Sequence, residues 1–448
     1  ICHNSLLDKQ ICHISIDSRN ITIHNTFWAL DGAATNGNLF IQDALLKGVN
    51  GIVCSKKFQD TITPFIDDQH WILLCDDTKD ALITAATCWR MNFTIPIIGI
   101  TGSVGKTTTK NLLKRIMEFN GQSVLAAHES QNSAIGVSLT LLRLSISHTA
   151  CICEMGISQP GEMALLSSIV KPTHAAITNI IDCHIDGLKN KATIAEEKLH
   201  IINHFTKDSV LFINGESDEL TKERYPYKTY MFGKGNYNDI VMKHTTGLQY
   251  EFIIDGQSYP FILPFLHEGI AYNACCAMSI ATILNMDIYM SLNAIQQFVP
   301  EKGRFEIINT YNPTIIINDA YNANPESMHA GLIAFEHIAH NKKKILVLGD
   351  MLELGELTQD WHEKIALQVL KMKRLLFCLC IGKNTHQAFK KYSPQECLIY
   401  MNSLEDTITF LQKQLGNDVA IFIKASNGIK LHTIPSLMAK STHVNNHE

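Results

Sequence analysis

Residues 97–110 read I-I-G-I-T-G-S-V-G-K-T-T-T-K. An apolar β-branched run comes first, a loop with two glycines follows, and Lys106 opens a stretch with apolar residues at helical spacing that ends before Gly121. A strand, a glycine loop and a helix in this order form the setting in which backbone N–H groups and a helix N-terminus bind phosphate. The segment therefore predicts a phosphate-binding loop in an α/β domain, with its helix over 106–120.

The residue types within this loop predict a nucleoside triphosphate as its ligand. Lys106 is expected to reach the β- and γ-phosphates, and the hydroxyl of Thr107 is expected to ligate Mg²⁺. The pattern is G-x-x-G-K-T-T, because Ile100 stands where the general motif has its first glycine. Motors, kinases, GTPases and ligases all use such a loop, so it does not define the reaction. The predicted phosphate-binding residues are Gly102, Ser103, Val104, Gly105, Lys106, Thr107 and Thr108.

The 448 residues are too many for one ordinary domain, and the pattern of strands and helices predicts an α/β chain of three domains. We expect a small α/β domain over 1–95, a central parallel-sheet domain with the phosphate loop over 96–305, and a doubly wound domain over 306–448. In the last range, strands are predicted at 314–318, 345–348, 375–381 and 419–423, and helices at 326–339, 360–373 and 404–415. The charge-free stretch 269–286 contains several polar residues, so we expect a buried helix there and no membrane insertion.

Composition narrows the class of protein further. The net charge of −5 argues against nucleic-acid binding, and the 46% hydrophobic content argues against disorder. The run at 342–344 is the longest basic one and is interpreted as a solvated turn. Thirteen cysteines without a paired C-x-x-C set argue against zinc and favour a reducing cytosol, and no signal-peptide pattern is visible. We therefore expect a cytoplasmic protein, and a monomer.

Three further residues are candidates for metal chemistry, each with a structural alternative. Glu154 ends an apolar strand, where a carboxylate can bind Mg²⁺ or form a cap or surface charge. His184 follows another strand, but a lone histidine is more often structural. Lys198 lies beside two glutamates on a predicted helix, which is typical of a solvated face. Ligands of open α/β sheets bind beyond the carboxyl ends of strands, so three strands ending in polar residues point to one crevice.

Taken in order, the motifs resemble the Mur ligases, the ATP-dependent amide-forming enzymes of peptidoglycan precursor synthesis. The segments at 318–328 and 348–356 resemble the members that add D-alanyl-D-alanine to the UDP-muramyl tripeptide, and the D-N-P-R signature of the members adding the third amino acid is absent. Residues 16–19 and 29–32 resemble the family's uridine-binding domain. The other matching segments are T-G-S-V-G-K-T-T-T at 101–109, C-E-M-G-I-S-Q-P-G-E-M at 153–163, K-P-T-H-A-A-I-T-N-I at 171–180 and H-I-D-G-L at 184–188.

The resemblance implies a fold and a reaction. It implies a uridine-nucleotide-binding first domain, a phosphate-loop central domain and a Rossmann-like C-terminal domain. Family members transfer the γ-phosphoryl group of ATP to a carboxylate, here that of UDP-N-acetylmuramoyl-tripeptide. The amine of D-alanyl-D-alanine then attacks the acyl phosphate, giving an amide, ADP and phosphate. This chemistry requires charge neutralisation at the phosphates and exclusion of water.

Residue roles are carried over from the resemblance position by position. Thr107 and Glu154 match Mg²⁺ ligands, His184 matches a ligand of a second Mg²⁺, and Lys198 matches a lysine carbamylated by CO₂. The expected catalytic set is Lys106, Glu154, His184 and Lys198. The residues matching nucleotide contacts are Asn273, Arg304, Asp319 and Asn322, and those matching substrate contacts are Ser18, Arg19, Asn132 and Asn324. An Asx-type turn is the alternative for Ser18 and Arg19. A hinge is expected near Gly303.

The chain departs from the family pattern at four places. Asn132 is followed by Ser133 where a second asparagine is usual, and Asn427 stands where the family has an arginine that can pair with a carboxylate. Residues 36–38 replace a D-G-H segment, and residues 267–270 replace a G-R-H-N segment. Substrate contacts in the first and third domains are therefore less well defined than the ATP site.

Two other classes of protein stay open from the sequence. A sister ligase such as a folylpolyglutamate synthase would lack the uridine-binding domain that residues 1–95 resemble. A kinase or regulatory nucleotide binder would need neither a carboxylate nor an amine substrate. Every metal-site candidate is retained, which argues against a nucleotide binder without catalytic activity. Whether the third residue of the acceptor peptide is diaminopimelate or lysine is left open by the sequence.

Overall fold

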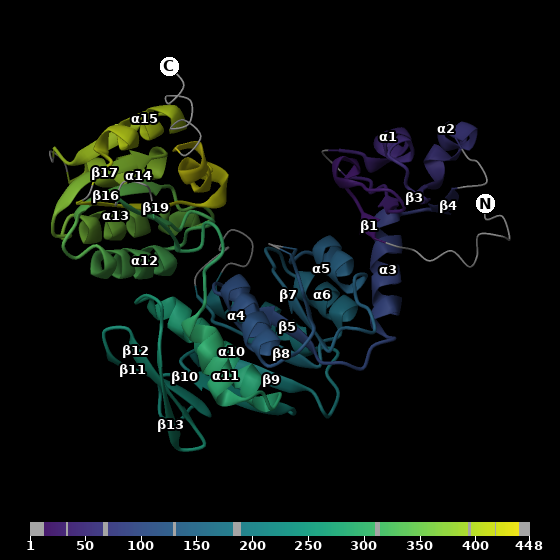
Figure 1. Ribbon diagram of the computed structural model, residues 1–448, viewed down its shortest axis with the longest axis horizontal. Coiled ribbons are helices and arrows are strands. Elements are labelled where there is room, and N and C mark those ends of the chain that lie inside the picture. Colours follow the sequence, from purple (N-terminus) through teal and green to yellow (C-terminus); the bar gives the residue numbers. More distant parts are fainter. Residues whose placement is uncertain are drawn as a thin grey trace.

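A computed structural model of the chain describes residues 13–32, 35–65, 70–128, 131–181, 190–309, 314–392, 396–416 and 418–438. The described helices and strands form three separate sheets with helices packed on their faces (Figure 1). The α/β architecture with three sheets confirms the predicted fold class. The strands of each sheet fall within one of the three predicted domain ranges, and the exact domain limits stay a prediction.

The first sheet is parallel and has the order β1-β2-β3-β4. Its last helix, α3, also contacts the central part of the chain. Leu82 of α3 packs with Trp28 and Trp71 of the first sheet, whereas Ala86 one turn later packs in the central core. The elements are β1 (Ile14–Ser15), β2 (Thr26–Trp28), α1 (Ile41–Leu46), β3 (Gly51–Ser55), α2 (Gln59–Ile62), β4 (Trp71–Cys75) and α3 (Thr78–Arg90).

Arg90 fixes the end of α3 to the central domain. Its side chain donates to the carbonyl oxygens of Val170 (2.8 Å), Lys171 (2.9 Å) and Phe93 (2.9 Å), and it is only 6% exposed. A buried guanidinium that satisfies three carbonyls, two of them at the C-terminus of α6 (Glu162–Val170), is a specific tether. The first sheet is therefore joined to the central domain by a packed helix.

The central sheet has the order β13-β12-β11-β10-β9-β8-β5-β7-β6. The strands from β6 to β11 are parallel, and β11, β12 and β13 pair antiparallel. The strands are β5 (Ile97–Thr101), β6 (Val124–Ala126), β7 (Ala150–Glu154), β8 (His174–Ile177), β9 (Val210–Asn214), β10 (Lys228–Gly233), β11 (Ile240–Thr246), β12 (Gln249–Ile254) and β13 (Gln257–Ile262).

Helices cover both faces of the central sheet. Leu112 of α4 packs with residues of α10 and α11 in one apolar core, whereas Val137 of α5, Leu166 of α6 and Ile194 of α8 pack in another. The stretch predicted to be a buried helix is α10, and within the described residues no helix is both long and apolar enough to cross a membrane. The helices are α4 (Lys106–Phe119), α5 (Ala134–Leu141), α6 (Glu162–Val170), α8 (Lys191–Leu199), α9 (Asp218–Thr221), α10 (Glu268–Ile283) and α11 (Ile288–Gln296).

The third sheet has the order β14-β15-β19-β16-β17-β18, parallel except for β14. The four predicted strands and three predicted helices of this range are all present. Three short elements, β14, β18 and α14, were not predicted, because four to eight residues carry too little periodicity. The elements are β14 (Glu306–Asn309), β15 (Ile315–Asn318), α12 (Pro325–Ile338), β16 (Lys343–Gly349), α13 (Thr358–Val369), β17 (Leu375–Ile381), α14 (Lys383–Lys390), β18 (Leu398–Met401), α15 (Leu404–Gln414) and β19 (Val419–Lys424).

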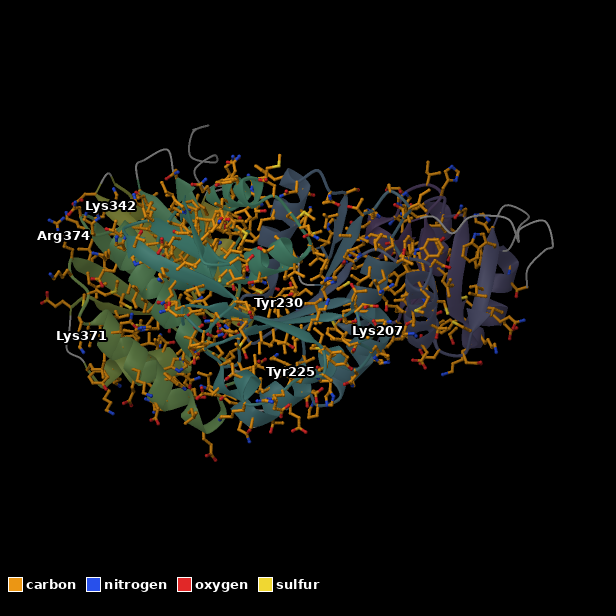
Figure 2. The ribbon with its side chains drawn as sticks, turned by 90° about the horizontal axis from the view of Figure 1, so that it is seen from below. Lys207, Tyr225, Tyr230, Lys342, Lys371 and Arg374 are labelled. Carbon is orange, nitrogen blue, oxygen red and sulfur yellow. The ribbon has the colours of Figure 1, made fainter. Side chains whose placement is uncertain are left out.

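The interpretation of residues 342–344 as a solvated turn is wrong for Lys343 and Lys344, which begin β16. Lys344 is buried in β16, and its Nζ donates to the carbonyl oxygen of Lys373 at 2.8 Å. Lys342, Lys371 and Arg374 lie at the outer edge of the C-terminal domain (Figure 2). A lysine stem can lie along apolar surface while its ammonium reaches a carbonyl, which a charge count along the sequence does not reveal.

Candidate active site

The phosphate loop lies between β5 and α4, as the sequence predicts. Gly105 precedes the first residue of α4 with φ of 86°, and Gly102 has φ of 141°. A Cβ at Gly105 would lie 2.2 Å from Oδ1 of Asn273, and one at Gly102 would lie 1.9 Å from Oγ1 of Thr178. Both backbone conformation and space therefore require glycine at these two positions.

Hydrogen bonds hold the loop in place against the end of β8. The backbone N–H of Ser103 donates to the carbonyl of Asn179 (3.0 Å), and that of Val104 donates to its Oδ1 (2.9 Å). Nζ of Lys106 donates to the carbonyl oxygens of Gly102 (2.8 Å) and Ser103 (3.3 Å). The ammonium group thus curls over its own loop, within the space that phosphates occupy in loops of this kind.

Glu154 stands at the centre of a buried oxygen cluster. Oγ1 of Thr107 donates to its Oε2 (2.7 Å), and Nδ2 of Asn132 donates to its Oε1 (3.0 Å). Glu154 and Thr107 are each 1% exposed, and within the described part of the chain no ion pair reaches this carboxylate. A buried carboxylate and a hydroxyl are the hard oxygen donors that Mg²⁺ prefers, so these residues fit the predicted metal.

Lys198 lies in α8 and is 1% exposed, so the interpretation of this helix face as solvated is wrong. The neighbouring Glu197 is also buried, and its Oε1 accepts from the backbone N–H groups of Gly161 (2.8 Å) and Met163 (3.2 Å) at the start of α6. That carboxylate therefore caps α6. A lysine is rarely buried unless its ammonium group is bound or chemically modified, so this burial is compatible with the predicted carbamate. The remaining member of the predicted catalytic set, His184, lies outside the described residues.

A cavity of about 590 Å³ lies between the central and C-terminal domains. The phosphate loop, the N-terminus of α10, the linker at 303–305 and the loops after β15, β16 and β19 line it. The prediction that polar ends of neighbouring strands share one crevice is confirmed. Every predicted nucleotide or metal residue that the structure describes lines this cavity, apart from Gly102 and Lys198; they are Ser103, Val104, Gly105, Lys106, Thr107, Thr108, Glu154, Asn273, Arg304, Asp319 and Asn322.

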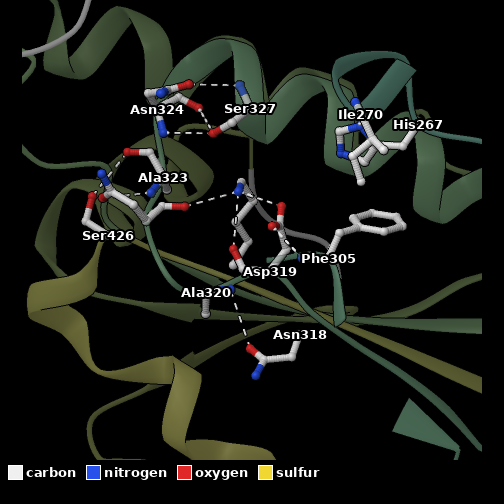
Figure 3. A network of polar contacts seen from close by, with 12 residues as sticks. His267, Ile270, Phe305, Asn318, Asp319, Ala320, Ala323, Asn324, Ser327 and Ser426 are labelled. Atoms are coloured by element: carbon white, nitrogen blue, oxygen red, sulfur yellow. Dashed lines mark hydrogen bonds and ion pairs between the residues drawn. The ribbon is translucent and has the colours of Figure 1, made fainter. Parts of the chain in front are cut away.

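The C-terminal wall of this cavity is built around Lys424, the ion-pair partner of Asp319. Figure 3 shows Asp319 among the polar groups of this wall. Nζ of Lys424 pairs with Oδ2 of Asp319 at 2.6 Å and donates to the carbonyl oxygens of Asp319 (3.2 Å) and Asn322 (3.1 Å). Oδ1 of Asp319 accepts from the backbone N–H of Phe305 in the linker (2.9 Å). One buried ion pair thus fixes the loop after β15 and the linker together. The sequence drew attention only to the nearby departure at Asn427 and did not assign Lys424 to the site.

Removing the charge of Lys424 is expected to destabilise the C-terminal domain. Lys424→Met leaves the Asp319 carboxylate, 13% exposed, without its cation, which is expected to lower the free energy of unfolding by about 3 kcal/mol. Urea unfolding of Lys424→Met, Asp319→Asn and the double variant measures the coupling free energy between the two side chains. We expect the double variant to be more stable than the sum of the single effects predicts. Strictly additive effects would show that the pair contributes nothing.

Two further predicted residues on this wall have well-defined contacts. The guanidinium of Arg304 lies 3.8 Å from the ring centroid of Tyr321, a cation–π contact. Asn324 caps α12, because its Oδ1 accepts from the N–H of Ser327 (2.9 Å). Asn324 borders the cavity, but its amide oxygen is already used by the helix. The structure thus shows Asn324 as a helix cap, and its contact with substrate stays a prediction.

His267 lies at the N-terminus of α10 and was missed as a site residue. Its Nδ1 accepts from the N–H of Ile270 (3.3 Å), and its ring packs edge-on against Phe305 with centroids 4.7 Å apart. Desolvation lowers the pKa of His267 to about 4. The sequence showed only a departure from a family motif here. The signal available was the position of a capping-competent residue directly before a long helix.

This lowered pKa predicts a pH-dependent stability. The folded form resists protonation, whereas the unfolded form binds a proton below pH 6.5, so stability is lost as pH falls from about 6.5 towards 4. We expect a decrease in the free energy of unfolding of about 1 kcal/mol between pH 7 and 5.5 from this group. Urea unfolding across this range tests it, with His267→Asn retaining a cap without titration. His174, whose pKa burial also lowers to about 4, continues to contribute in that variant. An equally steep pH dependence in His267→Asn would contradict the prediction.

Ser18 and Arg19 line neither cavity described here. Arg19 is exposed and pairs with Asp17 through Nε to Oδ1 (2.9 Å) and Nη2 to Oδ2 (2.8 Å). Oδ1 of Asp17 also accepts from the backbone N–H of Arg19 (3.0 Å), which is the Asx-type turn named as the alternative. The structure thus supports a turn here, and the uridine contact stays a prediction.

A second cavity of about 390 Å³ adjoins the first. It lies among α3 and the N-termini of α5 and α6, and it shares Lys106 and Asn132 with the larger cavity. Lys106 is the residue expected at the γ-phosphate. The two cavities therefore meet where a phosphoryl group would be transferred.

Comparison with known proteins agrees with this geometry. The family model for the Mur ligase middle domain matches residues 100–281, and that for the Mur ligase glutamate ligase domain matches residues 303–427. The UDP-N-acetylmuramoyl-tripeptide–D-alanyl-D-alanine ligase of Bacillus subtilis is 30% identical over 436 residues, covering 96% of this chain and 94% of the relative.

Two solved structures are also similar over nearly the whole chain. The structure of a UDP-N-acetylmuramoylalanyl-D-glutamyl-2,6-diaminopimelate–D-alanyl-D-alanyl ligase from Acinetobacter baumannii has a TM-score of 0.82 at 25% identity, covering 97% of this chain and 94% of that one. A MurF ligase from Thermotoga maritima, solved in complex with ADP, has a TM-score of 0.80 at 23% identity, covering 97% and 98%.

The phosphate loop and the buried carboxylate beside it agree with what the relatives show, an ATP-dependent ligase. The chain belongs to the Mur ligase family. Within that family it is similar over its whole length to the ligases that are named for UDP-N-acetylmuramoyl-tripeptide and D-alanyl-D-alanine.

Proposed function

We propose that this ligase joins D-alanyl-D-alanine to UDP-N-acetylmuramoyl-tripeptide with conversion of ATP to ADP and phosphate. The observation that carries the proposal is the junction of the two cavities at Lys106 and Asn132. A ligase that forms an acyl phosphate must bring a carboxylate to the γ-phosphate, and this junction supplies one such place. The names of the relatives supply the substrates.

In the first step, transfer of the γ-phosphoryl group to the carboxylate, the described residues have separate roles. ATP occupies the larger cavity with its phosphates on the loop, where Lys106 stabilises charge on the γ-phosphoryl group as it transfers to the carboxylate. Thr107 and Glu154 hold Mg²⁺, which when bound offsets the charge of the β- and γ-phosphates. Asn132 keeps the Glu154 carboxylate oriented through its 3.0 Å hydrogen bond. The base and sugar lie towards Asn273, Arg304, Asp319 and Asn322.

The second step needs an anionic metal site and exclusion of water. The carbamate that CO₂ would form on Lys198 would be an anion, and with His184 it would hold a second Mg²⁺. The amine of D-alanyl-D-alanine attacks the acyl carbon, phosphate leaves, and the amine loses a proton. In this proposal Asn324 contacts D-alanyl-D-alanine, and Ser18 and Arg19 contact the uridine end of the other substrate. Water that reached the acyl phosphate would hydrolyse it, so the cavity must close before reaction.

We propose that the cavity closes by rotation of the C-terminal domain about the linker at Gly303. This residue has φ of 73°, a conformation that glycine adopts without strain, and it lies directly before Arg304 and Phe305. The Asp319–Phe305 hydrogen bond couples the linker to the C-terminal sheet. Rotation here moves Lys424 and Asp319 towards the phosphate loop as one unit.

We further propose that the protein acts as a monomer in the cytoplasm. The described cysteines are free thiols, among them the neighbouring pair Cys151 and Cys153 with sulfurs 3.8 Å apart. Two close thiols that are not joined by a disulfide are typical of a reducing compartment. The cytoplasm is reducing, and it also contains the ATP that the reaction uses.

Phosphate release from ATP, followed with each substrate omitted in turn, tests the proposed function. We expect release only when UDP-N-acetylmuramoyl-tripeptide and D-alanyl-D-alanine are both present, with the UDP-muramyl-pentapeptide detected by mass. Release that needs neither substrate would show an unrelated ATPase. Release with the tripeptide and a different amine would show another acceptor specificity.

A further inference from the structure

The smaller cavity has a lining that suits an amino-acid side chain, with apolar and charged residues together. Apolar residues, Ile157, Leu165 and Leu166, form part of its wall, and Lys106 and Asn132 lie at its junction with the nucleotide cavity. The apolar part suits a methylene chain. A residue whose carboxylate reacts at Lys106 can therefore extend its side chain along this wall.

Two charged side chains of opposite sign line the same cavity. Glu162 lies in the first turn of α6, and its Oε2 accepts from the backbone N–H groups of Ser158 (2.6 Å) and Gln159 (2.9 Å). These bonds fix the carboxylate, while its Oε1 accepts no hydrogen bond within the described residues. Lys79 projects from the first turn of α3, and the described part of the chain offers its ammonium no carboxylate within ion-pair distance. A fixed carboxylate and a cation beside an apolar wall are complementary to a ligand carrying both charges.

We infer that Glu162 selects an acceptor peptide whose third residue ends in an ammonium group, and that Lys79 binds a carboxylate at the same end when one is present. The inference rests on the proposed function, because it places the reacting carboxylate of that third residue at Lys106. Diaminopimelate, which the A. baumannii relative carries in its name, ends in both groups, whereas lysine ends in the ammonium alone. The shared chemistry is an amino group at the end of a methylene chain.

The ratio of kcat/KM for three UDP-N-acetylmuramoyl-tripeptides tests the inference. Their third residues are lysine, norleucine and diaminopimelate; norleucine has the carbon chain of lysine without its amino group. We expect the wild type to favour lysine over norleucine by about tenfold, the size of one charge-assisted hydrogen bond. In Glu162→Gln this ratio falls to about one, because the amide oxygen still accepts from the loop but carries no charge. Glu405→Gln, the same change in the first turn of α15, retains the wild-type ratio.

A second variant distinguishes the role of Lys79 from that of Glu162. Lys79→Met is expected to lower kcat/KM for the diaminopimelate substrate about fivefold and leave that for the lysine substrate unchanged, since a partly exposed ion pair contributes modestly. An equal loss on all three substrates in Glu162→Gln would indicate a purely structural residue and overturn the assignment. An unchanged diaminopimelate rate in Lys79→Met would overturn the role of Lys79. Turnover of none of the three by the wild type would contradict the proposed function itself.

Discussion

Lys106→Ala is expected to lower kcat/KM for ATP-dependent ligation by about 10³-fold or more, because the variant removes the cation that lies at the junction of the two cavities. In the structure this ammonium donates to the carbonyl oxygens of Gly102 and Ser103. It is therefore held over the loop without serving as a core contact. The melting temperature should change by no more than about 2 °C. Steady-state phosphate release and thermal unfolding measure the two effects.

A matched variant on the same helix controls for charge alone. Lys114 lies two turns further along α4, where its side chain is 43% exposed and pairs with Glu118 at 3.5 Å. Lys114→Ala removes the same charge from the same helix and should leave kcat/KM within about twofold of wild type, since exposed pairs contribute little. Equal phosphate release by Lys106→Ala and Lys114→Ala would refute the assignment of the loop.

Lys198→Ala is expected to lower kcat by about 10²- to 10³-fold while ATP binding survives, because the proposed carbamate serves a metal and not the nucleotide. Lys198 is 1% exposed, so truncation to alanine also leaves a cavity. Lys198→Met keeps most of the volume and removes the amine, and replacing a buried cation with an apolar chain need not destabilise the fold. Both variants should bind a non-hydrolysed ATP analogue within about threefold of wild type.

Two controls make the Lys198 result specific to the carbamate. Lys198→Arg keeps a cation but removes the amine that reacts with CO₂, so it should be as inactive as Lys198→Met. Depleting CO₂ and bicarbonate from the wild-type enzyme should lower its activity, and adding bicarbonate should restore it. Wild-type turnover in Lys198→Met would exclude the proposed role of Lys198. Full activity of Lys198→Arg would show that the reaction needs a positive charge at this position and not a carbamate.

The fold was largely predictable because its deciding segments are long and strongly patterned. The run 97–110 combines an apolar strand, two obligate glycines and a helix start, and each of these local preferences agrees with the others. The antiparallel strands β11 to β13 were not predicted. The available signal was Asp255-Gly256, a two-residue hairpin turn between β12 and β13 that lies between alternating apolar residues.

The site was predictable where a motif fixes residue type and spacing, and less so where tertiary contacts decide. Thr107 and Glu154 are 47 positions apart, yet the family pattern placed them together, and their 2.7 Å hydrogen bond agrees. Lys424 and Asp319 are 105 positions apart, and the sequence alone could not show that two buried charges meet across β15 and β19. The burial of Lys198 was likewise hidden, because Glu196 and Glu197 beside it are typical of a solvated helix face.

The central claim is that this chain activates a carboxylate as an acyl phosphate before forming an amide. Ligation with UDP-N-acetylmuramoyl-tripeptide labelled with ¹⁸O in its reacting carboxylate, followed by mass analysis of the released phosphate, tests it directly. The account predicts that one ¹⁸O atom appears in each phosphate, because the carboxylate oxygen that attacks the γ-phosphoryl group leaves with it. Phosphate carrying oxygen from labelled water instead, with none from the carboxylate, would contradict the account and show hydrolysis of ATP without activation of the peptide.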